Sequence, residues 1–297
     1  MKSGSSIRTV PMIVLAFMLI SFAFFAGCKK NDSITNPTTT TQDPQATNDA
    51  AVSLGGALAI NNGGLLDQVA DLLNTPTDNG VLAKEIGTDP NTVSTVTKTY
   101  DSTTGWWTVD IDRSKSELVW ASHYTREYMH QFLNSTGQFQ KMYIDNGDTA
   151  YTVNHKIVGG TGEFNNLWLS HKLTALSCIW IGTGTNTSTV TINTSSPYTR
   201  SAVDTIWGAN GGVRTLDHTI TVNFINVKGP RGTGLDWHLK TSGTLTGHYH
   251  ATVTFQKGTK YKETTIDRDF TITLGGAKLV IGIGGETFQA DANTGGI

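Results

Sequence analysis

Cysteine is almost absent from this chain of 297 residues, which contains only Cys28 and Cys178. Cys178 lies within the apolar run 176–180, and a cysteine in such a run usually behaves as a small buried hydrophobic residue. A reactive thiol needs an accessible position beside a cation or a base. The sequence therefore predicts a buried Cys178 without a catalytic role.

Charged residues are also scarce. They make up 15% of the chain, whereas soluble domains usually contain about 25%. The formal net charge is −2, and a nucleic-acid-binding protein needs a concentrated basic face to neutralise phosphates. This balance argues against nucleic acid as a partner. Threonine, serine, asparagine and glycine take the place of charged residues, a composition typical of exported β-proteins.

Acidic residues are missing from the start of the chain until Asp32. Lys2 and Arg8 provide a positive beginning, and residues 12–26 are almost continuously apolar. This run has the length of a signal-peptide core and is shorter than the roughly 20 residues that cross a bilayer as a helix. The segment thus predicts an export signal.

The apolar run ends in Phe25-Ala26-Gly27-Cys28. This stretch resembles the lipobox of a bacterial lipoprotein signal, although Phe25 stands where Leu, Val or Ile is more usual. The resemblance covers residues 1–28 only. It implies removal of residues 1–27 and acylation of Cys28, which would make the lipid bilayer a partner. It also implies a place in the cell envelope, and Lys29 directly after the cysteine favours the outer membrane.

Two segments separate the lipobox from the rest of the chain. Residues 28–47 are rich in threonine, glutamine and proline, which predicts a disordered tether. Residues 48–76 have helical periodicity, and their apolar stripe needs a surface to cover. We therefore expect a helical hairpin docked on a sheet. The stripe comprises Leu65, Leu66, Val69, Leu72 and Leu73, with Asp67, Gln68 and Asp71 opposite.

From residue 91 to residue 297 the apolar period becomes two, and turn residues recur between the runs. Short links favour antiparallel pairing of consecutive strands, and Asn146-Gly147 predicts a tight type I′ hairpin. The expected fold is mainly β: a large antiparallel meander of about a dozen strands with the helical hairpin packed on it. A sandwich, a curved sheet and a barrel-like body all fit this pattern.

Histidines provide the candidate metal ligands. His248 and His250 point to one face of a strand, and His238 lies on the segment just before it, which we interpret as strand. Imidazoles at positions i and i+2 can reach one metal ion. The alternative is a solvated sheet face, because Thr246 and Thr252 continue the same polar row.

Paired carboxylates offer the only hint of an enzyme. Asp110 with Asp112, and Asp267 with Asp269, each share a strand face. Glycoside hydrolysis uses two carboxyl groups that flank a bond and usually come from different strands. Two such groups on one strand lie about 6.5 Å apart and favour a solvated outer face. The glycine-rich pieces lack a phosphate-loop signature, so we expect no enzyme activity and no cofactor.

Aromatic residues suggest a ligand surface. Trp106 and Trp107 are adjacent on a strand and must face opposite sides. One of them could stack on a sugar ring, with Tyr124 or Tyr128 extending the platform, unless the helical hairpin covers it. Trp120 shares a strand face with these tyrosines.

The sequence thus predicts a non-catalytic envelope lipoprotein with a binding or structural β domain. Its partner would be an envelope protein or a glycan. One alternative is a carrier of an apolar ligand, with a pocket lined by Trp120, Tyr124, Tyr128 and Phe132. The other alternative is a carbohydrate-binding or carbohydrate-active protein.

Overall fold

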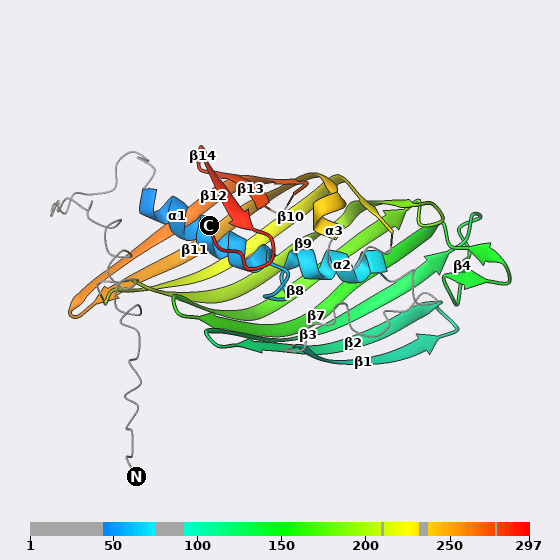
Figure 1. The fold of residues 1–297 in the computed structure, drawn as a ribbon, viewed down its shortest axis with the longest axis horizontal. Helices are drawn as coiled ribbons and strands as arrows, with labels where there is room; N and C mark the ends of the chain where they lie inside the picture. The colour runs from blue at the N-terminus through cyan, green and yellow to red at the C-terminus, as the bar shows by residue number, and fades with distance from the viewer. Residues whose placement is uncertain (1–43, 75–91, 209–210, 232–236, 277) are drawn as a thin grey trace, which may run out of the picture. The chain divides into compact units, whose positions relative to one another are not determined.

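The computed structural model describes residues 44–74, 92–208, 211–231, 237–276 and 278–297. Cys28 and the predicted signal lie outside these residues, as does most of the predicted tether. Figure 1 shows the described chain as a broad antiparallel sheet with two helices lying across one of its faces. We call this face the inner face and the opposite one the outer face.

One continuous sheet contains most of the strands, so the mainly β antiparallel fold is confirmed, and the strands that the structure describes do not form a two-sheet sandwich. Nearly every strand pairs with its neighbours in sequence, because the links between strands are short turns. Across the sheet the strands are β1 (Thr92–Asp101), β2 (Trp106–Glu117), β3 (Trp120–Leu133), β7 (Thr152–Asn166), β8 (Leu169–Thr183), β9 (Thr189–Trp207), β10 (Val213–Pro230), β11 (Ser242–Lys257), β12 (Lys260–Leu274), β13 (Lys278–Ile283) and β14 (Glu286–Asp291).

Short elements complete the described part of the chain. They are β4 (Phe139–Gln140) beside β3, the small β5–β6 ladder (Ile144–Asp145 and Asp148–Thr149), and α3 (Trp237–Lys240). Asn146 and Gly147 have φ values of 50° and 90° between β5 and β6, which is the conformation that a type I′ turn requires. The predicted hairpin at this position is therefore confirmed.

The helical hairpin consists of α1 (Pro44–Leu58) and α2 (Leu65–Asn74). Helix α1 begins inside the segment 28–47 that the sequence assigns to the tether, so the tether prediction is wrong for residues 44–47. Proline is favourable in a first helical turn, where its missing N–H is not needed. Thr47 and Asp49 are already buried.

Both faces of α2 are buried, which corrects the expectation of one docked stripe with polar residues opposite. The five leucine and valine side chains of the stripe are at most 2% exposed, and Asp67, Gln68 and Asp71 are at most 4% exposed. The polar positions are buried because the sheet supplies partners for them. None of the described helices is long and apolar enough to cross a membrane.

The C-terminal segment packs against the helical hairpin. The backbone N–H groups of Ile60 and Asn61 donate hydrogen bonds to the carbonyl oxygens of Ala292 (3.1 Å) and Asn293 (2.9 Å). A Cβ atom on Gly55 would lie 2.4 Å from the carbonyl oxygen of Gly295, so the two segments approach each other too closely for any side chain. The hairpin is thus held by the sheet and also by the end of the chain.

Candidate functional site

The contact between the helical hairpin and the inner face is rich in buried polar groups. Helix α1 contributes Asp49, whose carboxylate lies 2.8 Å from Nε of Arg214 on β10. One helical turn later, Ser53 donates a hydrogen bond from Oγ to the Asp204 carboxylate on β9. Buried polar groups persist only when they find partners, so these residues fix where α1 sits on the sheet.

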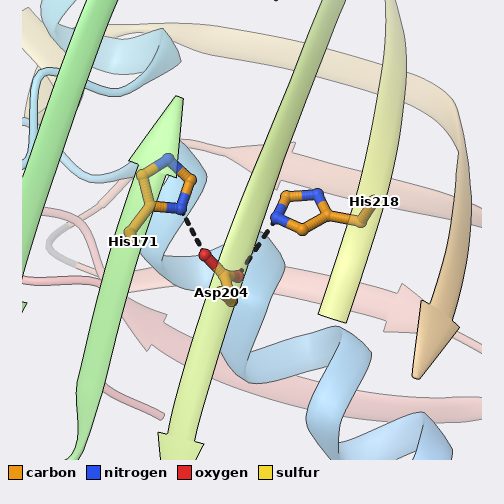
Figure 2. A group of neighbouring side chains, drawn as sticks. All are labelled: His171, Asp204 and His218. Carbon is orange, nitrogen blue, oxygen red and sulfur yellow. Dashed lines mark hydrogen bonds and ion pairs between the residues drawn. The ribbon is translucent and has the colours of Figure 1, made fainter. Parts of the chain in front are cut away.

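Asp204 lies at the centre of a three-strand cluster that Figure 2 shows. His171 on β8 and His218 on β10 flank it, and all three residues are at most 1% exposed. His171 Nδ1 donates to one carboxylate oxygen of Asp204. His218 Nε2 lies 3.1 Å from the other oxygen and 3.1 Å from Ser53 Oγ. The strands bring the three together because each side chain occupies an inward position of its strand.

Arg200 determines where the protons of this cluster lie. Its Nη2 atom is 2.7 Å from His171 Nε2, and a guanidinium can only donate. His171 Nε2 must therefore accept, and the proton of the neutral imidazole sits on Nδ1, facing Asp204. Burial lowers the pKa of His171 to about 4, despite the nearby Asp204 carboxylate. Burial would raise the pKa of Asp204, but the facing imidazoles hold it below its ordinary value.

This cluster is the one group of three potential metal ligands with mutually close ligand atoms among the described residues, all within 4.8 Å of one another. Its chemistry does not suit a cation. A metal ion at His171 Nδ1 would require the proton to move to Nε2, where it would point at the Arg200 donor 2.7 Å away. The cluster is therefore better described as a hydrogen-bond network than as a metal centre.

The same cluster does not have the geometry of a nucleophilic triad. In a triad the serine contacts one imidazole nitrogen and the carboxylate contacts the other. Here Ser53 and Asp204 both face Nε2 of His218, and Nδ1 of His218 has no hydrogen-bond partner among the described residues. Ser53 itself is 1% exposed. This serine joins α1 to the sheet and is not positioned to attack a substrate.

Helix α2 makes a second buried contact with the sheet. Arg113 on β2 lies 3.3 Å from a carboxylate oxygen of Asp67 and 2.7 Å from one of Asp71. Tyr128 on β3 donates a 3.0 Å hydrogen bond to Asp71. Burial raises the pKa of Asp67 to about 6, against the opposing effect of Arg113. One guanidinium therefore serves two buried carboxyl groups.

A row of aromatic rings lies beside these contacts on β3, β7 and β8. His130 and His155 face each other with their Nδ1 atoms 3.0 Å apart, and Trp180 stacks on His155 at 5.4 Å. Burial lowers the pKa of His130 to about 3 and that of His155 well below its ordinary value. Both imidazoles are thus neutral members of the core.

The predicted ligand platform on β3 is covered by the helical hairpin. Trp120 donates from Nε1 to the side-chain oxygen of Asn62 at 3.1 Å, and Tyr128 bonds to Asp71. The ring of Tyr124 leaves no space for a Cβ atom on Gly63, which would lie 2.5 Å away. Phe132, the fourth residue of the expected pocket lining, is fully buried.

Trp106 and Trp107 lie on opposite faces of β2, as expected for adjacent strand residues, and both are half-buried. Lys156 sits over the ring of Trp106 at 4.2 Å. Trp107 packs against Tyr100 at 4.9 Å and donates from Nε1 to the carbonyl oxygen of Lys141 at 2.7 Å. These contacts with the two rings thus come from Lys156, Tyr100 and Lys141 and not from the helical hairpin.

The predicted metal ligands are divided between two elements. His238 belongs to α3, so the interpretation of its segment as a strand is wrong, and its side chain lies outside the described positions. His248 and His250 lie on the outer face of β11 beside carboxylates of β12. His250 Nδ1 is 3.0 Å from Asp267, and His248 lies 3.1 Å from Asp267 and 2.8 Å from Asp269. These are exposed cross-strand pairs.

The carboxylates Asp110 and Asp112 occupy a hollow of about 440 Å³ on the outer face, which Glu127 and Gly160 also line. Asp112 pairs with His123 at 2.9 Å, and both side chains are more than 49% exposed. The two aspartates stand side by side on β2, which is not the arrangement of two groups that flank a bond from opposite sides.

The residues of the buried network were not predicted from the sequence. Along each strand, buried apolar residues at every second position mark the inner face. Each of these polar residues stands at one of those positions. Leu169, His171 and Leu173 share one face of β8, as do Leu216, His218 and Ile220 on β10. A polar residue at a position where apolar residues are expected was therefore the sequence feature that could have indicated a buried polar group. Its partners on α1 could not be read from the sequence.

Comparisons with known protein families, with curated proteins and with solved structures find no match to this chain.

Proposed function

We propose that this protein is a lipid-anchored component of the bacterial cell envelope whose β domain serves a binding or structural role without catalysis. The observation that supports this most is the covered inner face. The helical hairpin covers the inner face of the sheet, and the hairpin's buried acidic groups are paired with Arg113 and Arg214 of the sheet. A face closed by buried ion pairs favours a permanent structural contact.

The lipid anchor in this proposal depends on the lipobox that ends at Cys28 and on the apolar run before it. Several acyl chains hold a protein durably, since each buried methylene contributes about 0.8 kcal/mol. The outer membrane remains the preferred location because Lys29 follows the cysteine.

The alternative of an apolar-ligand carrier receives less support. It requires an unfilled pocket beside Trp120, Tyr124, Tyr128 and Phe132, and the first three of these contact the helical hairpin. The carbohydrate alternative now depends on the outer-face hollow with Asp110 and Asp112. Both alternatives name a specific class of ligand, whereas the envelope proposal does not.

Mass spectrometry of the protein purified from bacterial membranes tests the anchor. The proposal expects a mature chain that begins at an acylated Cys28, and a Cys28→Ala variant that leaves the membrane fraction. An unmodified Cys28 thiol, or a mature amino terminus at another residue, would contradict it.

A further inference from the structure

The most exposed apolar side chains of the described protein gather at one end of the sheet. Four of the five most exposed are Leu118 (100%), Leu167 (63%), Tyr261 (63%) and Trp168 (62%). They lie in or within two residues of the β2–β3, β7–β8 and β11–β12 turns, which share this end. Exposed apolar groups clustered in this way mark an interaction surface.

The turns themselves are unusual. The β2–β3 link consists of Leu118 and Val119, and the β7–β8 link consists of Leu167 and Trp168. Tight hairpin links normally contain Gly, Asn, Asp or Ser, whose conformations suit a turn and which are well solvated. Trp207, which is 41% exposed, joins this group because its backbone N–H bonds to the carbonyl oxygen of Trp168 at 3.0 Å. We call Leu118, Val119, Leu167, Trp168 and Trp207 the apolar turns.

The chain enters the folded domain at the same end. Helix α1 begins there in Figure 1, and its first turns lie beside Arg214 near the start of β10 and beside Lys262 near the start of β12. Residues 28–43, which precede α1, can span at most about 55 Å. An anchor at Cys28 therefore keeps this end of the domain within about 55 Å of the bilayer.

The chemistry of this end also suits a lipid surface. Tryptophan and tyrosine are preferred at membrane–water interfaces, where the ring is buried and the polar edge stays hydrated. Lys257, Lys260 and Lys262 surround the β11–β12 turn, and lysines close to a membrane are attracted to anionic headgroups.

We propose that the apolar turns dock on the lipid bilayer, so that the domain rests against the membrane with its strands leading away from it. The choice of a bilayer as partner rests on the anchor proposed above. The docking adds a contact that is independent of the acyl chains and fixes which surfaces of the domain face away from the membrane.

Vesicle co-sedimentation tests this with the unacylated chain that begins at Lys29, which retains every described contact. The vesicles contain phosphatidylethanolamine and phosphatidylglycerol. We expect the parent chain to bind and the variant Leu118→Asp with Trp168→Asp to lose at least about tenfold in partition coefficient. The matched control is Phe139→Asp with Ile144→Asp, which makes the same change at the opposite end and should bind like the parent chain.

Equal binding by the parent chain and both variants, or no binding by any of them, would overturn the proposal. Loss of binding in both variants alike would overturn it as well. Vesicle binding by a chain whose Cys28 proves to be unmodified would leave the docking intact while the anchor fails, so the two proposals can be separated.

A second measurement uses the complete acylated protein in vesicles that carry brominated acyl chains, which quench nearby tryptophan fluorescence. We expect Trp168→Phe to remove a large part of the quenching and Trp106→Phe, at the opposite end of the sheet, to leave it unchanged. Quenching that is insensitive to Trp168 would show that the apolar turns stay away from the lipid.

Discussion

Asp204 accepts hydrogen bonds from three groups at the contact between α1 and the sheet, namely His171, His218 and Ser53. An amide at this position has one oxygen in place of two, so its NH2 group would face either the N–H of His171 or the pair formed by Ser53 Oγ and His218 Nε2. We expect Asp204→Asn to lower the free energy of unfolding by about 3 kcal/mol, because it leaves buried donors without an anionic acceptor.

Urea unfolding measures this loss. The control Asp217→Asn lies on β10 with its side chain exposed, and it should change the free energy of unfolding by less than about 0.5 kcal/mol. Equal stabilities for the two variants would mean that the network does not hold the helix. A large rise in the melting temperature of the parent protein with added zinc would instead indicate a metal centre.

The buried histidines make stability depend on pH. The pKa values of His130 and His171 are about 3 and 4 in the folded chain, and 6.5 is their ordinary value. Below pH 6.5 the unfolded chain therefore binds protons that the folded chain does not, and stability falls as the pH drops towards 4. His155 acts in the same direction. Asp67, with a pKa near 6, opposes this trend between pH 6 and 3.8.

Unfolding titrations at a series of pH values should show the free energy of unfolding decreasing by about 1–3 kcal/mol per pH unit below pH 6. The variant His123→Gln removes an exposed histidine and serves as the control for the loss of one imidazole. A constant stability between pH 7 and pH 4.5 would contradict buried neutral imidazoles.

Local sequence pattern predicts the position of some residues, but it does not predict the role of residues that depend on distant partners. Cys178 is buried as its apolar run predicts, and Asn146 adopts the positive φ that its turn requires. Ser53 and Asp204 are 151 positions apart in the chain. No periodicity within either segment encodes their contact.

At the level of elements, the turn between α1 and α2 depends on Gly63. Its φ is 62°, and a Cβ atom there would lie 2.5 Å from the ring of Tyr124. We expect Gly63→Ala to destabilise the protein by about 2–4 kcal/mol, since backbone strain and overlap with a packed ring add together.

Gly137 offers a matched control, because its φ is 81° but nothing lies within 4 Å of the Cβ position. Gly137→Ala should therefore cost only about 1 kcal/mol for the backbone conformation. If thermal unfolding finds the two variants equally stable, the ring of Tyr124 does not clamp the turn.

Helix α2 shows why an amphipathic pattern can mislead. Its leucine stripe predicts a docked helix, and the helix is docked. The polar positions between the leucines are buried as well, because Arg113 of β2 reaches Asp67 and Asp71. The spacing of the leucines shows which side of the helix is polar but carries no information on whether a distant arginine will meet that side.

For the whole molecule, the alternation of apolar residues and the short links were sufficient to predict an antiparallel meander of about a dozen strands. They could not decide between a sandwich and one sheet. That choice depends on whether successive strands keep pairing across the full width of the sheet, and it is set by contacts far apart in the sequence. The described chain keeps pairing from β1 to β14.

The central claim is that the helical hairpin is a permanent part of the core and does not open as a lid. Hydrogen exchange followed by mass spectrometry tests it most directly. We predict that the hydrogen-bonded amides of the two helices, those of residues 48–58 and 68–73, exchange as slowly as those of the central strands β9 and β10, because all of them open only when the domain unfolds. Exchange of the two helices well before these strands, with the sheet still protected, would show a separately opening lid and contradict the claim.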